Sequence, residues 1–151
     1  MTAPVLTACG GFLLAVLWMD LIFDVQVLGH GRRTELPEAV LSSIASYYGR
    51  ATTTSRPMSY LIALVMVVLL TALGFQAMRG HDPGWLLVVS AILAGFPILL
   101  ALLRTVPNAV RLGARVGGAA EQTRLARAIF RDHVVCLGCV VAFLALRVAA
   151  V

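Results

Sequence analysis

Three titratable residues in apolar surroundings are the strongest candidates for chemistry in this sequence. Asp20 and Asp24 lie four residues apart in an apolar segment, so on a helix their carboxylates share one face. A carboxylate at membrane depth needs a partner or water, and this face should therefore point into the protein. His133 lies near the start of the last apolar segment and could act as a general base. If the protein is an enzyme, we expect Asp20, Asp24 and His133 to be catalytic.

Basic and polar residues near the ends of the other apolar segments extend this set. In an antiparallel bundle they would lie at the same level as the two aspartates, and together they would form a polar pocket. The expected ligand-binding residues are Asp20, Asp24, Arg104, Asn108, Arg111, Arg131 and His133. The alternative is that the carboxylates only neutralise arginines and fix the helix register, because structural ion pairs use the same residue types. The spacing matches no metal-ligand motif, so we predict no metal site, and the sequence identifies no cofactor.

A Cys-x-x-Cys motif at Cys136 and Cys139 is a second candidate for chemistry, because such pairs support thiol-disulfide exchange or soft-metal binding. Here the motif lies within an apolar segment, towards the side where arginines accumulate. That is the reducing, cytoplasmic side if the arginines mark topology. We therefore interpret both cysteines as small residues for helix packing, together with Gly138.

Four long apolar segments must position these residues. The chain has 151 residues, of which 60% are hydrophobic and only 13% charged, a balance that excludes an ordinary soluble domain. A bilayer-spanning helix needs about 20 apolar residues. We predict a single domain with an all-α fold, an antiparallel four-helix transmembrane bundle with a short interfacial amphipathic helix between the first two spans. The expected spans are about 5–28, 57–78, 84–104 and 132–151, and the interfacial helix is about 37–48.

Arginine placement predicts the orientation. The chain has 12 arginines and no lysine, and all but Arg79 and Arg147 lie in the connections after the first and third spans or at their borders. Cytoplasmic connections retain basic residues during insertion, so we expect both termini outside a bacterial inner (plasma) membrane. The net charge of +5 then reflects topology and attraction to anionic lipid, and we expect no nucleic-acid partner.

The leading functional hypothesis is a multi-pass protein that binds a lipid or lipophilic small molecule in a polar pocket at the cytoplasmic end of the bundle, whether or not it is also a membrane enzyme. One alternative is an accessory or assembly subunit of a larger membrane complex. Another is an oligomeric proton or cation transporter, in which Asp20 and Asp24 line the route. The expected partners are membrane lipids, a lipophilic ligand, and further copies of this chain or other membrane subunits.

Overall fold

The computed structural model describes residues 2–31, 33–54, 56–80 and 82–150, without the side chain of Arg56. Within these ranges the chain is helical and contains no strand. Four helical stretches are long and apolar enough to cross a membrane: Thr2–His30, Pro57–Arg79, Gly84–Gly113 and Ala119–Ala149. The predicted fold class, an all-α membrane bundle, is confirmed, and the chain is a multi-pass membrane protein.

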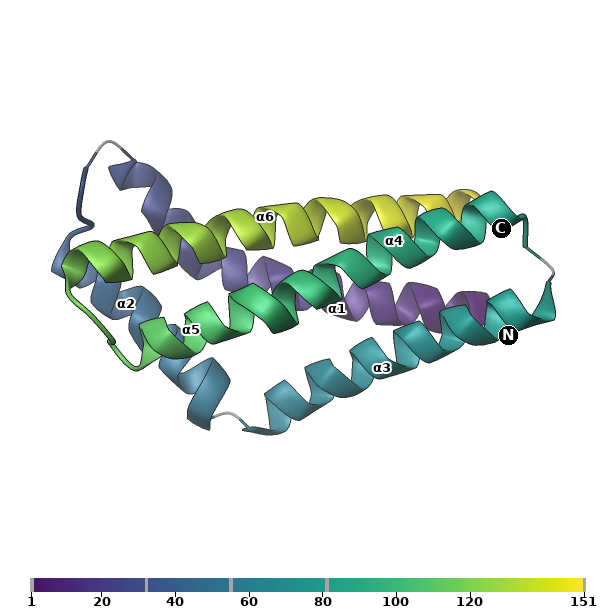
Figure 1. The fold of residues 1–151 in the computed structure, drawn as a ribbon, viewed down its shortest axis with the longest axis horizontal. Coiled ribbons are helices and arrows are strands. Elements are labelled where there is room, and N and C mark those ends of the chain that lie inside the picture. The colour runs from purple at the N-terminus through teal and green to yellow at the C-terminus, as the bar shows by residue number, and fades with distance from the viewer. Residues whose placement is uncertain (1, 32, 55, 81, 151) are drawn as a thin grey trace.

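The four long helices are α1 (Thr2–Asp24), α3 (Arg56–Arg79), α4 (Gly84–Leu100) and α6 (Ala119–Ala149). In Figure 1, α1 and α4 lie between α3 and α6, and each of the two packs against both of these outer helices. Both chain termini and the turn between α3 and α4 lie at one end of the bundle. The other end, which we call the arginine-rich end, holds α2 (Glu38–Gly49), α5 (Val106–Gly113) and the first turns of α6.

Helix α2 lies at the position predicted for the amphipathic helix and closes the arginine-rich end. Pro37 precedes its first turn, and the side chains at Leu41, Ile44, Ala45 and Tyr48 are buried at helical spacing. The helix crosses α5 so closely that a Cβ atom on Gly113 would lie 2.6 Å from the backbone nitrogen of Gly49. This crossing requires glycine at position 113 and brings the end of α2 next to the bundle interior.

The third membrane-crossing stretch is longer than the predicted 84–104. After α4, a wide π-helical turn (Ala101–Thr105) leads directly into α5, so the helical path continues to Gly113. Pro107 has no backbone N–H to donate one turn back, and a wide turn before it leaves room for the proline ring. Pro107 therefore does not end the helix. The helical path continues into α5, which packs against α2 and α6.

Two separate apolar clusters form the core. One lies at the arginine-rich end and includes Leu41, Ile44, Leu112 and Ile129, from α2, α5 and α6. The other joins α1, α3, α4 and α6, and its largest fully buried side chain is Phe143. Asp24, Thr105, Asp132 and His133 are buried polar residues outside both clusters, and the candidate functional site is built around Asp24 and His133.

Candidate functional site

A buried triad of Asp24, His133 and Tyr48 joins α1, α6 and α2. The Tyr48 hydroxyl donates to Asp24 Oδ1 at 2.7 Å, and His133 Nδ1 lies 2.7 Å from Asp24 Oδ2. An ionised carboxylate can only accept hydrogen bonds, so with Asp24 ionised His133 Nδ1 is the donor in this contact. Asp24 is fully buried, and its two oxygens thus hold the histidine ring and the tyrosine in fixed orientations.

Asp20 forms the neighbouring layer, one helical turn away from Asp24. Its Oδ1 accepts a 2.7 Å hydrogen bond from the Tyr47 hydroxyl, and the Tyr47 ring stacks on Phe23 with 4.0 Å between centroids. Its Oδ2 lies 3.8 Å from His133 Nε2, the ring nitrogen that Asp24 does not bind. The structure therefore brings the three predicted catalytic residues, Asp20, Asp24 and His133, into one cluster.

The two tyrosines are functional-site residues that the sequence analysis did not single out. The sequence predicts only that position 47 and position 48 end an interfacial helix, because α2 follows α1 through a long connection and its crossing point is not encoded locally. The signal that could have found them is their adjacency, since consecutive positions on a helix that crosses α1 can reach two carboxylates one turn apart. Burial and the nearby carboxylates Asp24 and Asp20 raise the pKa of the Tyr48 phenol far above its ordinary value, so it remains a donor.

A cavity of about 370 Å³ lies beside this cluster, between α1, α3, α4 and α6. Asp20, Tyr48 and His133 line it at one end, with Thr52, Ser59 and Thr105, while most of its wall is apolar. Part of its wall reaches the outer surface between α3 and α5, where the lining side chains Ala63, Leu102, Val106 and Val110 are exposed. The cavity thus connects a buried polar cluster with the lipid-facing side of the bundle.

The charged residues of the cluster belong to two membrane-crossing stretches, since Asp20 and Asp24 lie in Thr2–His30 and His133 lies in Ala119–Ala149. Arg147, near the far end of α6, donates from Nη1 to Asp82 Oδ2 at 3.0 Å and is almost fully buried. His133 is 14 residues before Arg147 on the same helix, which corresponds to about 21 Å at 1.5 Å per residue. If the Arg147 pair lies at one membrane surface, His133 lies within the hydrocarbon layer of about 30 Å, towards its other side.

The other predicted ligand-binding residues lie elsewhere. Arg104 pairs with Asp132 at 3.2 Å, and Arg111 pairs with Glu121 at 3.0 Å. Asn108 is half-buried on α5 and Arg131 is exposed on α6, and neither makes a side-chain hydrogen bond within the described ranges. Across these same ranges no arginine pairs with Asp20 or Asp24, so the two aspartates face His133 and tyrosine hydroxyls instead.

The cysteines do not join the cluster. Cys9, Cys136 and Cys139 are free thiols, and Cys136 packs against α4 with its sulfur 3.9 Å from the Pro97 carbonyl oxygen. Among the described residues no group of three or more His, Cys, Asp or Glu side chains is arranged to hold a metal ion. The arrangement can therefore accept and donate hydrogen bonds and move a proton through His133, next to an apolar cavity.

Comparison with known proteins gives no relative: the chain matches no protein family, no curated protein and no solved structure.

Proposed function

We propose that this protein binds a lipophilic small molecule or lipid in the cavity between α1, α3, α4 and α6, with the polar group of the ligand against Asp20 and His133. One observation carries the proposal: an apolar cavity that reaches the lipid-facing surface has the buried cluster at one end. Its volume of about 370 Å³ lies within the usual range of small-molecule sites, about 300–1,000 Å³. Apolar walls with a few fixed polar groups are typical of such sites.

The charge of the cluster restricts the polar group of the ligand. Two carboxylates, Asp20 and Asp24, face one histidine, so with both carboxylates ionised the cluster is negative whether or not the histidine is protonated. An anionic group would be repelled at a depth where charges are weakly screened. A neutral hydrogen-bonding group or a protonated amine is complementary to the cluster, whereas a fatty acid or an acidic phospholipid is not.

Catalysis is a second candidate, favoured by the orientation of His133. Asp24 holds Nδ1, which leaves Nε2 near Asp20 at the polar end of the cavity. In many enzymes the general base is a histidine whose ring is oriented by a buried carboxylate. In this case His133 Nε2 would take a proton from a bound ligand, and Asp24 would stabilise the resulting imidazolium.

For the whole molecule we propose an inner-membrane location with the arginine-rich end in the cytoplasm and both termini outside. The positive-inside bias supports this orientation, since ten of the 12 arginines lie in or beside the two connections at that end. The polar cluster would then lie in the cytoplasmic half of the bilayer. Cysteine accessibility to a membrane-impermeant reagent, with cysteines introduced at Thr34 and Gly84 in separate variants, would test the orientation; Gly84 is exposed and an added Cβ there meets no atom within 4 Å.

The binding proposal is tested by native mass spectrometry of the protein released from lipid nanodiscs. This measurement reports the copy number and any retained non-protein mass together. We expect a defined retained mass that is lost in Ala63→Trp, which blocks the cavity opening, and in Asp20→Asn. The matched control is Leu64→Trp, because Leu64 is exposed on the same helix and does not line the cavity.

The outcomes separate the competing functions. A retained mass that persists in Ala63→Trp is not held in this cavity and contradicts the proposal. Bare protein, or protein that copurifies only with other membrane subunits, supports the accessory-subunit hypothesis instead. Proton or cation flux in proteoliposomes, lost in Asp20→Asn, would support the transporter hypothesis.

A further inference from the structure

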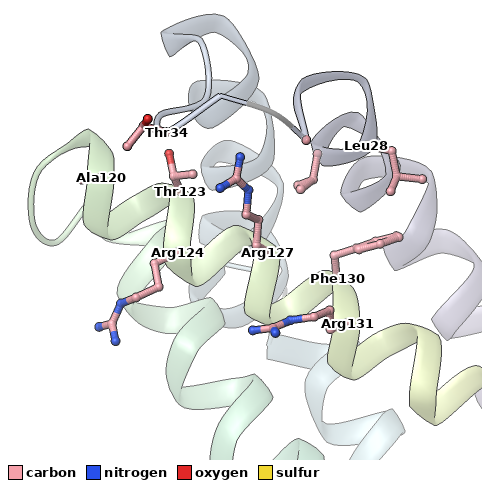
Figure 2. Close-up of a pocket in the computed structure, with 10 residues that line it drawn as sticks. Leu28, Thr34, Ala120, Thr123, Arg124, Arg127, Phe130 and Arg131 are labelled. Carbon is pink, nitrogen blue, oxygen red and sulfur yellow. The ribbon is translucent and has the colours of Figure 1, made fainter.

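A second cleft lies at the arginine-rich end, between the short 3-10 segment η1 (Val25–His30), the residues that follow it, and α6. Its volume is about 430 Å³, and its lining residues are Val27, Leu28, Gly31, Thr34, Ala120, Thr123, Arg124, Arg127, Phe130 and Arg131. Figure 2 shows the three arginines along one stretch of α6, with Phe130 directed towards Leu28. The cleft is thus basic and apolar at once, and it is distinct from the central cavity.

The positive charge of the cleft is largely uncompensated. Arg124 is paired with Glu121 at 2.8 Å, but Arg127 and Arg131 have no carboxylate partner within the described ranges. The Arg127 guanidinium donates to the backbone carbonyls of His30 and Arg33, at 3.3 and 2.6 Å, and these bonds fix it at the cleft. No carboxylate lines the cleft in the described part of the chain. The two guanidinium groups therefore retain donors for an anion.

The apolar part of the cleft indicates what kind of anion it takes. Leu28 is 62% exposed beside half-buried Phe130, and both lie next to the arginines. A soluble anion would leave this apolar surface in contact with water. A phospholipid offers a phosphate for the arginines and acyl chains for Leu28 and Phe130.

The depth of the cleft also fits a lipid headgroup. Arg131 and Arg127 lie 16 and 20 residues before Arg147 on α6, which corresponds to about 24 and 30 Å along the helix axis. With Arg147 at one membrane surface, Arg127 lies at the opposite edge of a hydrocarbon layer of about 30 Å, and Arg131 lies about one helical turn inside that edge. A long arginine side chain at either position can extend to the headgroups of that leaflet.

From these observations we infer that the cleft between η1 and α6 is a binding site for an anionic phospholipid, whose phosphate is held by Arg127 and Arg131. The site differs in charge from the central cavity, which has the Asp20 carboxylate in its wall. It does not depend on the function proposed for that cavity.

The test uses the full-length protein in nanodiscs that contain phosphatidylcholine and phosphatidylglycerol. Native mass spectrometry after gentle release counts the phosphatidylglycerol molecules that stay bound. An arginine near an anionic membrane surface contributes about fivefold in affinity, so retention should fall about fivefold in Arg131→Gln and about 30-fold in the double variant Arg127→Gln/Arg131→Gln. Arg50→Gln is the matched control, because exposed Arg50 has the same charge at the same end but does not line the cleft.

Three results would overturn the inference. Retention that is unchanged in the double variant shows that the lipid binds elsewhere. An equal loss in Arg50→Gln shows a general attraction to the membrane surface and no defined site. Displacement of the lipid by excess glycerol phosphate shows that the site takes a soluble phosphate. Since Arg131 has no internal hydrogen-bond partner within the described ranges, Arg131→Gln should keep the wild-type unfolding midpoint, and this checks that the variant is folded.

Discussion

The hydrogen bonds of Asp24 should make it the largest single polar contributor to the stability of the bundle. Asp24 is fully buried and accepts hydrogen bonds from Tyr48 and His133, both at 2.7 Å. Tyr48→Phe removes one hydrogen bond to a charged group, which should cost about 1.5–3 kcal/mol. Asp24→Asn keeps the side-chain volume but removes the charge that faces the histidine and one acceptor oxygen. It should cost about 3–5 kcal/mol, the range for breaking a buried charged pair.

The two effects should not add, because the tyrosine hydroxyl and Asp24 share one hydrogen bond. In Asp24→Asn the Tyr48 hydroxyl has already lost its charged acceptor, so the double variant should be more stable than the sum of the single costs predicts. A coupling of about 1–2 kcal/mol is expected for residues in direct contact. The free energy of unfolding in detergent micelles, followed by far-ultraviolet circular dichroism, gives all three values.

Two exposed positions provide matched controls. Glu35→Gln neutralises a carboxylate in the connection before α2, and Tyr60→Phe removes the hydroxyl of a tyrosine that is 71% exposed. Both should leave the free energy of unfolding close to that of the wild type. If Asp24→Asn is as stable as Glu35→Gln, or if the two single effects are additive, the network described here does not hold α1, α2 and α6 together.

Three further predictions concern other parts of the molecule. Gly113→Ala should destabilise the bundle by about 1–3 kcal/mol, because its Cβ would meet Gly49, whereas Gly138→Ala meets no atom within 4 Å and should be tolerated; unfolding midpoints compare them. Arg147→Met should uncouple the end of α6 from the α3–α4 turn by removing its bond to Asp82, and hydrogen exchange near the turn should rise. Burial raises the pKa of Tyr47 and Tyr48, so their phenols should stay protonated in the folded protein above about pH 10, the ordinary phenol value. The unfolded chain loses these protons first, and stability should therefore fall as the pH rises above that value, as unfolding curves at increasing pH would show.

The fold could be predicted from the sequence because the membrane imposes a simple rule on it. Uncharged stretches such as 57–78 are long enough to cross a bilayer, and a soluble domain of this size could not bury four apolar segments of this kind. The four-residue spacing of Asp20 and Asp24 likewise predicts that they share one face of α1, and this prediction requires no tertiary contact. These inferences depend only on local periodicity and length.

The partners of the aspartates could not be predicted in the same way. Arg104 and Arg111 were expected near them because both have the complementary charge, but they pair with Asp132 and Glu121. Which carboxylate each arginine pairs with depends on the rotation of each helix about its axis and on the crossing of α2 and α5, where Gly113 contacts Gly49. Neither is encoded in the charge pattern. The sequence also did not predict the π-helical turn before Pro107. Because of this turn the helix continues into α5, although a proline usually ends a helix.

The central cavity opens between α3 and α5. This opening determines the concentration scale on which the affinity of the cavity for its proposed ligand should be expressed. Lining residues such as Ala63 and Val106 are exposed on the outside of the bundle, so the ligand proposed for this cavity can arrive from the bilayer. Such a ligand is already dissolved in hydrocarbon, and the transfer of its apolar chain out of water contributes to partitioning and not to site occupancy. Selectivity then comes from the polar end of the cavity. Dissociation constants for the proposed ligand are best stated as mole fractions in the membrane, and ligands with the same polar group but different chain lengths should have nearly the same value on that scale.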